Sequence, residues 1–396
     1  MSASILLLCA FGGFVVLAMV VVVILVLRKR SSTGSGATPS STSSSSVATW
    51  VSNAEKSLTT NENDYLGELS SGSAWNAHEN GMQWWTAGFM IGCWWKMYAL
   101  TQKESWKKLA EKMLPRLAEW QTRTNTHDVG FVMMAAYGNA PSPDAGALVK
   151  SARNLAARYS PKRKLLRSWG ENKLGDNNFT VIVDNLMNLK LLWEAAKLSG
   201  GQASWKDIAK QHALTSIQLF VRPNGSTYHK IIFSSADVKP GFRGTHQGLT
   251  NESTWSRGQA WAMYGFCDAF AYTGDVKFRD VAEKCASYFL DNLPADNVPL
   301  WDFQATDAQK DTSAASIGAC ALFKLSKHTS NAKYADRARA ILSSLDASFS
   351  GTAKGLKSIL CCGVASNNKD RRRGVNVGLV YGDYYFLEAL QLAQSA

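Results

Sequence analysis

Aromatic, amide and guanidinium side chains gather in residues 245–265, where a polar loop changes into an apolar helical pattern. Trp255 and Trp261 flank Arg257 within about two helical turns, and Gln247 precedes them. Tryptophan rings stack on sugars, a guanidinium forms paired hydrogen bonds to a carboxylate, and amides reach hydroxyl groups. The combination predicts binding of a sugar acid. A well-anchored helix start with a capping box is the structural alternative.

Two aspartates are the candidates for acid–base chemistry. Asp184 begins an otherwise apolar helical pattern, V-I-V-D-N-L-M-N-L, and Asp128 follows His127 in T-H-D-V-G-F. Because an unpaired carboxylate is costly to bury, an aspartate in such a place indicates a functional acid. The structural alternative for both residues is a carboxylate that caps a helix or is stabilised by the helix dipole.

Two other residues carry a weaker signal. Trp85 opens a further apolar helical pattern beside Trp84, where core packing is the default interpretation and a platform for a sugar is the alternative. His229 follows a turn in N-G-S-T-Y-H-K, and a lone histidine is more often structural than catalytic. The sequence contains no nucleophile elbow, phosphate-binding loop or nucleotide-binding fingerprint.

The cysteines predict no metal site. The chain has seven of them, with no C-x-x-C pair and no cluster of histidine and cysteine. Cys361 and Cys362 are adjacent, and we do not expect them to pair with each other. Four others lie among apolar residues with helical spacing and are expected to be buried thiols: Cys93, Cys267, Cys285 and Cys320.

From Val47 onward the apolar residues recur with the period of a helix. The links are often short, which predicts helical hairpins. Residues 165–169 and 227–233 are expected to be extended insertions. The predicted helices lie near 47–65, 84–100, 104–123, 128–137, 144–159, 181–199, 203–219, 255–273, 275–292, 312–327, 331–348 and 379–394.

Twelve helices in six hairpins suggest an all-α toroid with an inner and an outer ring. Inner helices contact both rings and should be apolar nearly all round. In such a toroid, residues at the starts of the inner helices face one cavity. The expected inner segments are 84–98, 181–193, 255–270 and 379–390. The expected outer segments, which carry lysine and glutamate, are 104–123, 203–219, 275–292 and 331–348.

The first 46 residues have a different composition. Residues 5–27 contain no charged side chain and are long enough to cross a bilayer as a helix, and Arg-Lys-Arg follows at 28–30. We therefore predict a transmembrane anchor with a basic flank at 1–30, a disordered Ser/Thr-rich linker at 31–46 and a catalytic domain at 47–396. A cleaved signal peptide fits less well, because the apolar run is long and the charges follow it.

The topology of a single-pass membrane protein remains open at this stage. The charges after the span favour a cytosolic domain, whereas the Ser/Thr-rich linker and the sequons at Asn178, Asn224 and Asn251 favour a lumenal or extracellular one. We expect the lumenal or extracellular side. The formal net charge of +12 suits an anionic partner. No nucleic-acid signature accompanies it, and Arg371, Arg372 and Arg373 form one short run that we interpret as a solvated turn.

Several motifs occur in an order that resembles the unsaturated glucuronyl hydrolases, glycoside hydrolase family 88. The resemblance covers nearly all of residues 47–396. The motifs are W-T-x-G-F at 85–89, H-D-x-G-F at 127–131, D-N-x-M-N-L at 184–189, R-P-x-G-S-x-Y-H at 222–229, S-T-W-S-R-G-Q-A-W at 253–261 and Y-G-D-Y-Y-F-x-E-A-L at 381–390.

The resemblance implies an (α/α)6 barrel that acts on short oligosaccharides ending in a 4,5-unsaturated uronic acid. It implies that Asp184 is the general acid and base and that Asp128 is a second essential carboxylate. The chemistry is hydration of the C4=C5 bond, which needs no metal or other cofactor. The residues that the resemblance places around the substrate are Trp85, His229, Gln247, Trp255, Arg257 and Trp261.

Three alternatives compete with this interpretation. The related unsaturated rhamnogalacturonyl hydrolases share the barrel and the chemistry but act on pectin fragments. An inactive, membrane-tethered carbohydrate-binding protein would lack the acid, whereas Asp184 and Asp128 are both present. A purely structural toroid for protein binding would leave the tryptophans, Arg257 and the aspartates unexplained. The sequence makes no prediction about the oligomeric state.

Overall fold

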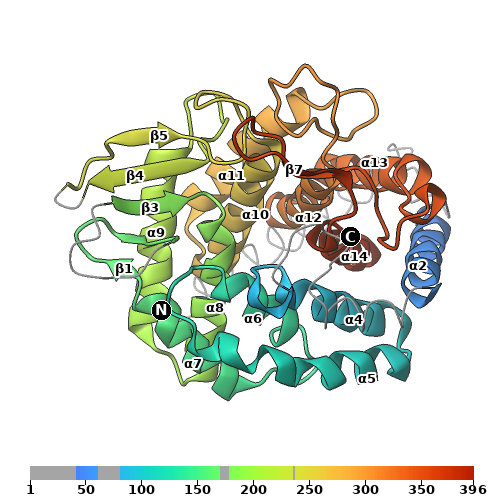
Figure 1. Ribbon diagram of the computed structural model, residues 1–396, viewed down its shortest axis with the longest axis horizontal. Coiled ribbons are helices and arrows are strands. Elements are labelled where there is room, and N and C mark those ends of the chain that lie inside the picture. Colours follow the sequence, from blue (N-terminus) through green and yellow to red (C-terminus); the bar gives the residue numbers. More distant parts are fainter. Residues whose placement is uncertain (1–41, 61–80, 170–177, 235–236) are drawn as a thin grey trace, which may run out of the picture. The chain divides into compact units, whose positions relative to one another are not determined.

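Six of the described helices form a closed inner ring, in which each helix packs on the next and the last packs on the first (Figure 1). The four predicted inner segments are in this ring, together with the helices that begin near residues 129 and 312. The ring consists of α4 (Ala87–Thr101), α6 (Val129–Ala136), α8 (Asn185–Leu198), α10 (Ser256–Thr273), α12 (Thr312–Thr329) and α14 (Val380–Gln394).

The inner helices approach one another closely because glycines lie at their contacts. A Cβ atom on Gly88 of α4 would lie 2.3 Å from the backbone oxygen of Val132 on α6. A Cβ atom on Gly265 of α10 would lie 2.5 Å from the Cβ of Leu186 on α8. Both distances are far below van der Waals contact, so any larger residue would push the helices apart and open the ring.

The outer helices pair with the inner ones, as the short links predict. Contacts join α4 to α5, α6 to α7, α8 to α9, α10 to α11 and α12 to α13. The predicted helix at 104–123 is interrupted near Pro115, since proline cannot donate a helical hydrogen bond, and it continues as the 3-10 helix η2 (Leu114–Thr122). The outer helices of these pairs are α5 (Glu104–Met113), α7 (Ala145–Ala156), α9 (Ala203–Phe220), α11 (Val276–Asp291) and α13 (Ala332–Ser348), and the further helix α2 (Thr42–Thr60) contacts α13 through Asn53 and Asp346.

Small antiparallel sheets correct the all-α prediction. The predicted extended insertions contain β2 (Leu165–Leu166), which pairs with β1 (Tyr159–Ser160), and most of β4 (Lys230–Ser234). Strand β4 lies between β3 (Asn178–Ile182) and β5 (Phe242–Gly244). The β-branched run before Asp184 therefore forms a strand, not the first turn of the predicted helix 181–199. A third sheet pairs β6 (Gly363–Ser366) with β7 (Arg373–Val377).

The computed structural model describes residues 42–60, 81–169, 178–234 and 237–396. Val47–Ala396 forms a compact unit. The predicted anchor at 5–27 and its basic flank lie outside the described residues, and no described helix is both long and apolar enough to cross a membrane. Helix α2 begins at Thr42, so the end of the predicted linker is helical. Serine tolerates this, because extending a formed helix costs much less than nucleating one.

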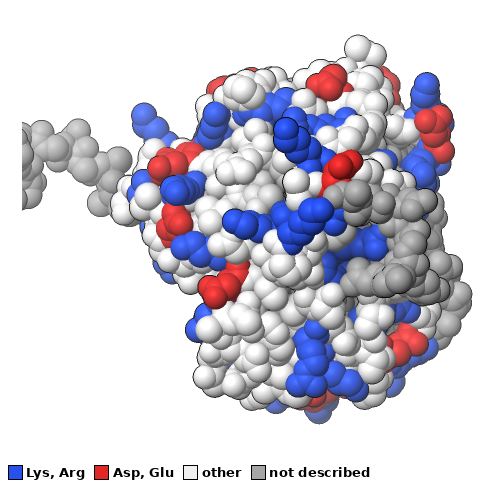
Figure 2. All heavy atoms as spheres, turned by 90° about the vertical axis from the view of Figure 1, so that its left-hand side faces the viewer, with Lys and Arg blue, Asp and Glu red and all other residues white. Residues whose placement is uncertain are grey.

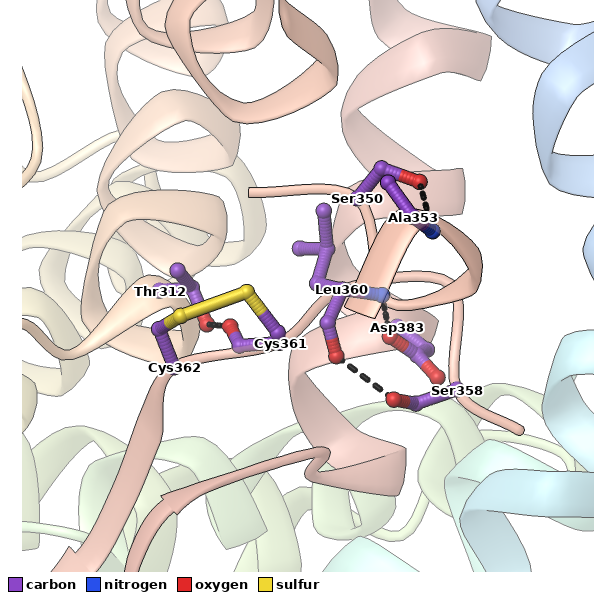
Figure 3. The surroundings of a disulfide bond; sticks show 8 residues. All are labelled: Thr312, Ser350, Ala353, Ser358, Leu360, Cys361, Cys362 and Asp383. Carbon is purple, nitrogen blue, oxygen red and sulfur yellow. Dashed lines mark hydrogen bonds between the residues drawn. A yellow bond between two sulfur atoms is a disulfide. The ribbon is translucent and has the colours of Figure 1, made fainter. Parts of the chain in front are cut away.

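The cysteines that the structure describes follow the sequence prediction except at one pair. Four are free and buried, as expected: Cys93, Cys267, Cys285 and Cys320. Cys361 and Cys362, which we expected not to pair, are joined by a disulfide between adjacent residues (Figure 3). The backbone accommodates this pairing with Cys362 in the left-handed region, at a φ of 64°. The hydroxyl of Thr312 holds the loop by donating to the carbonyl of Cys361 at 2.7 Å.

Candidate active site

A cavity of about 320 Å³ opens where several inner helices begin. Asp128, Asp184 and Trp255 are the N-cap residues of α6, α8 and α10, and all three line it. Six of the eight candidate residues from the sequence are in the wall: Trp85, Asp128, Asp184, Gln247, Trp255 and Arg257. The other two, His229 and Trp261, are not part of the lining.

Asp184 is a buried carboxyl group that does not cap its helix. Its residue is 8% exposed, and it makes no side-chain capping hydrogen bond. Its Oδ2 atom has no hydrogen-bond partner among the described residues. Burial raises the pKa of Asp184 to about 7, the positive charge of Arg257 opposes this rise, and the Asp128 charge adds to it. Asp184 can therefore hold a proton near neutral pH and release it.

Asp128 is held in place by its sequence neighbours. The hydroxyl of Thr126 donates to its Oδ2 at 2.6 Å, and the Nε2 of His127 lies 3.2 Å from its Oδ1. His127 is fully buried, and burial lowers its pKa, so the imidazole is neutral at physiological pH. Asp128 also makes no capping hydrogen bond to α6. The carboxyl group is thus oriented toward the cavity side and leaves the helix end uncapped.

The guanidinium of Arg257 is bound by the protein itself. Its Nη1 lies 2.5 Å from Oδ2 of Asp311 and donates to the carbonyl of Val364 at 2.6 Å. Its Nη2 donates to the carbonyl of Ala365 at 2.7 Å. The side chain is 1% exposed and lies over the ring of Trp255, 4.4 Å from its centroid. These contacts tie α10 to strand β6. They use the groups that the sequence analysis assigned to a substrate carboxylate.

The remaining candidates divide between the wall and the layer behind it. Trp85 packs with Tyr381, with ring centroids 4.9 Å apart, and lines the cavity. Gln247 lines it too, and its amide donates to the carbonyl of Ala365 at 2.8 Å. Trp261 is fully buried behind the wall, 5.1 Å from Phe131 between ring centroids. This position indicates that Trp261 supports the wall and does not face the cavity.

His229 lies behind the wall, beside Asp184. Strands β3 and β4 pair with Ile182 opposite Lys230, and this register places His229 next to the turn that carries Asp184. Its Nε2 is 3.5 Å from Oδ2 of Asp184, and its ring stacks on Trp255 with centroids 4.3 Å apart. Burial holds the pKa of His229 well below its usual value. A neutral imidazole therefore faces the carboxyl group.

A family model described as Glycosyl Hydrolase Family 88 matches residues 50–348 of the chain. The chain belongs to this family. It is therefore a glycoside hydrolase, and the cavity lined by Asp128 and Asp184 is the candidate active site of this family 88 enzyme. Within the described ranges, no group of three or more histidine, cysteine, aspartate or glutamate residues could hold a metal ion.

Similar proteins are known from bacteria. An unsaturated glucuronyl hydrolase of Formosa agariphila is 35% identical over 322 residues, which cover 78% of this chain and 80% of the relative. An unsaturated chondroitin disaccharide hydrolase of Streptococcus pneumoniae is 32% identical, over 77% of this chain and 81% of the relative. The crystal structure of an unsaturated glucuronyl hydrolase specific for heparin matches with a TM-score of 0.79 and 32% identity, over 88% of this chain and 97% of the other.

Several lining residues of the family 88 enzyme were not found from the sequence. Arg373, interpreted above as part of a solvated turn, lies on β7, is partly buried and lines the cavity. The alternation of the run R-G-V-N-V could have indicated a short strand with one arginine turned inward. The other lining residues missed by the sequence analysis include Arg123, Trp169, His246 and Tyr381.

One outer face of the protein is basic as well. On the face that carries the sheet of β3, β4 and β5, lysine and arginine side chains are more numerous than aspartate and glutamate (Figure 2). At the cavity, burial lowers the pKa of His246 to about 4, and the positive charges of Arg371 and Lys230 add to this effect. The lining histidine is therefore neutral, and the local positive charge comes from arginine and lysine. This field favours a negatively charged ligand.

Proposed function

We propose that this family 88 enzyme removes a 4,5-unsaturated uronic acid from the non-reducing end of short oligosaccharides. The observation that carries the proposal is a buried carboxyl group, Asp184, whose pKa of about 7 suits a proton donor at neutral pH. It lies in a cavity with the indoles of Trp85 and Trp255 and the cation of Arg373. The activities named for the bacterial relatives support this substrate class.

In the proposed reaction, Asp184 gives its proton to C4 of the C4=C5 bond. Positive charge develops at C5 and is shared with the ring oxygen. A water molecule adds to C5 and returns one proton to Asp184, so one residue serves as acid and then as base. The resulting hemiketal opens, the glycosidic bond breaks, and the shortened sugar leaves. Because this is not displacement at the anomeric carbon, the separation of the two carboxyl groups does not predict a stereochemical class.

The other lining residues take supporting roles in this proposal. The Asp128 charge adds to the raised pKa of Asp184, so it helps to keep the donor protonated. The indole of Trp85, which is partly exposed and lines the cavity, offers a flat apolar surface to the sugar. The arginines at the cavity attract the carboxylate of the uronide. Arg257 shapes the cavity through its bonds to the protein, so Arg373 and Arg123 are the better candidates for contact with the substrate charge.

Unsaturated disaccharides made by different polysaccharide lyases test the proposal directly. Hydration of C4=C5 removes the absorbance of the unsaturated uronate, so we expect this absorbance to fall with glucuronyl disaccharides from heparin and chondroitin. Turnover restricted to unsaturated rhamnogalacturonyl disaccharides from pectin would instead favour the related pectin-directed activity. Binding of any of these sugars without loss of absorbance would leave a carbohydrate-binding protein and would overturn the proposal.

We also propose, on the composition of residues 1–46, that the enzyme is a single-pass membrane protein with its catalytic domain on the lumenal or extracellular side. A shortened protein that starts near Val47 should then be soluble and fully active. Protein from the native host should shift in mobility when glycans are removed enzymatically, since Asn178, Asn224 and Asn251 lie in sequons. No shift would favour the cytosolic orientation.

A further inference from the structure

His229 is fixed by its backbone and its ring. Its carbonyl accepts from the N–H of Val183 at 2.9 Å, and its own N–H donates to the carbonyl of Gly244 at 3.1 Å. Its ring stacks on Trp255, and its side chain is 2% exposed. It does not line the cavity. His229 is therefore placed to act on a cavity residue and not on the substrate.

The hydrogen bonds of the ring determine where its proton is. The Nδ1 atom accepts from the backbone N–H of His246 at 3.2 Å and from that of Gln247 at 3.3 Å. A ring nitrogen that accepts carries no proton, so the proton of the neutral imidazole is on Nε2. Burial and the positive charges of Arg257 and Lys230 keep the ring neutral by lowering its pKa. His229 thus has one N–H group, and it is on the side of Asp184.

The two facing atoms have no other partner. His229 Nε2 and Asp184 Oδ2 are both buried, and neither has a hydrogen-bond partner among the described residues. They are 3.5 Å apart, which is longer than a formed hydrogen bond. Contacts of this kind in ligand-free active sites shorten in the complex with substrate. A donor and an acceptor in these positions form a hydrogen bond once the acceptor is an anion.

We propose that His229 is a positioning residue for Asp184, which it orients and whose carboxylate it stabilises through Nε2–H after the proton has left. This inference rests on the proposed function. His229 keeps its own proton throughout. The proton that moves is the one on Asp184, which passes to C4 and is replaced by a proton from the attacking water. Because the anion exists only after proton transfer begins, the bond favours the transition state over the bound ground state.

Ionisable groups on three other elements interact with Asp184. Arg257 of α10 lowers its pKa, and Asp128 at the start of α6 raises it. Tyr381 of α14 is buried, and the Asp184 charge contributes to its raised pKa of about 12, so this phenol is neutral at the pH of the assay. These groups stay in place when His229 is replaced. Loss of the Nε2–H donor should therefore raise the pKa of Asp184 further, because only the anionic form loses a stabilising contact.

The test compares His229→Leu with His229→Gln, whose amide N–H can take the place of Nε2–H. In His229→Leu we expect kcat to fall by about 10- to 100-fold, the effect of a hydrogen bond to a charged group, with KM changed less than about threefold. In the pH profile of kcat, the limb that reports the titration of Asp184 should move to higher pH by about one unit. His229→Gln should recover most of kcat and most of the shift.

A second buried histidine gives a matched control. His212 on α9 is fully buried, its Nδ1 accepts from the backbone N–H of Leu166 at 2.9 Å, and like His229 it does not line the cavity. His212→Leu removes a buried imidazole and should leave the pH limb of kcat unchanged. A rise in KM with an unmoved pH limb in His229→Leu would overturn the inference in favour of a substrate contact. Equal kinetics of His229→Leu and His229→Gln would overturn the donor role.

Two further measurements keep the result interpretable. If His229→Leu does not fold, ¹⁵N NMR of the wild-type imidazoles decides, because the inference requires a neutral Nε2–H ring from about pH 5 to 8 and an Nδ1–H ring would overturn it. Asp184→Asn is assayed beside the histidine variants. Full turnover in Asp184→Asn means that the acid role of Asp184 has failed, whereas no loss of absorbance with the wild-type protein means that the proposed function has failed. An inactive Asp184→Asn beside His229 variants that change only KM means that this inference alone has failed.

Discussion

The two sides of the cavity satisfy their polar groups in opposite ways. We call Asp184, with His229 behind it, the acid wall, and we call Arg257, with Asp311 and the carbonyls of residues 364 and 365 that hold it, the anchored wall. In the acid wall, two buried polar atoms face each other without a hydrogen bond. In the anchored wall, Asp311 is fully buried and accepts from Arg257 and from Ser313, and Arg257 also donates to two carbonyls.

This difference separates chemistry from support. An unsatisfied buried acid is unstable as an anion, which is the property that a proton donor needs. A buried ion pair whose hydrogen bonds are all made costs little as long as both partners are present, and it holds one geometry. Substitutions in the acid wall should therefore change turnover more than stability, and substitutions in the anchored wall should do the reverse.

Asp184→Asn gives the largest expected effect on the acid wall. The amide keeps the shape of the carboxyl group and removes its proton-donating ability, so we expect turnover to fall by at least about 10³-fold. The folded protein should remain intact, as judged by circular dichroism and by its melting temperature. Turnover near the wild-type value would remove Asp184 from the acid role and would end the contrast between the walls.

Asp311→Ala is the corresponding test of the anchored wall. It leaves the guanidinium of Arg257 buried without its counter-ion, so we expect the free energy of unfolding in urea to fall by about 3–5 kcal/mol. Asp296 forms an exposed ion pair with Lys310 at 2.8 Å, and Asp296→Ala is the control, with an expected loss below about 1 kcal/mol. A loss equally small in Asp311→Ala would show that the anchored wall contributes no more than a surface ion pair.

The substitution of Arg257 by lysine sharpens the same contrast. Lysine keeps the charge but cannot reach Asp311 and two carbonyls in one plane, so we expect Arg257→Lys to lower the free energy of unfolding by about 1–3 kcal/mol. Binding of an unsaturated disaccharide, measured by titration in an Asp184→Asn background, should change little. A stable protein with weakened binding would mean that the guanidinium holds the substrate carboxylate after all.

The raised pKa of Asp184 predicts a pH-dependent cost to stability. Its folded-state value is about 7 and its usual value is 3.8. Between these pH values the folded protein binds more protons than the unfolded chain, so stability falls as pH rises through this window and then stays lower. Asp184→Asn removes this loss, so its advantage should be absent below about pH 4 and should reach about 4 kcal/mol above pH 8.

Urea unfolding of both proteins at pH 4 and pH 8 measures this difference. Asp370→Asn, at an exposed position, serves as the control and should follow the wild type at both pH values. A constant difference between Asp184→Asn and the wild type from pH 4 to pH 8 would contradict the buried, protonated state of Asp184. It would also mean that ionisation of Asp184 does not lower the free energy of unfolding.

The smallest expected effect concerns the disulfide between Cys361 and Cys362, which lies just before the carbonyls of the anchored wall (Figure 3). It closes a very short loop, so chain entropy predicts a loss of only about 1 kcal/mol in Cys361→Ser. The hydroxyl of Thr312 donates to the backbone carbonyl of Cys361, so this hydrogen bond does not depend on the cysteine side chain and should remain. Differential scanning calorimetry with and without a dithiol reductant measures the change. A much larger loss would show that the disulfide, not the ion pair, fixes this wall.

Local patterns in the sequence determined the helices and the two carboxyl candidates. Helical periodicity depends on neighbouring residues, so the order of the inner and outer helices could be predicted from it. The sheets were harder to predict. The run Val181–Val183 is apolar enough for a buried helix or a strand, and its strand partner, β4, is about fifty residues away in the chain.

Only the tertiary structure decided which groups meet in the cavity. Arg257 finds its counter-ion 54 residues further along the chain, and Arg373 turns inward from β7. The register of β3 and β4 brings His229 to Asp184, and burial then sets the pKa of both groups. The sequence by itself determined which residue types could do the chemistry, because that property belongs to single side chains. Their distances, protonation states and partners were decided by the fold, because each depends on groups far apart in the chain.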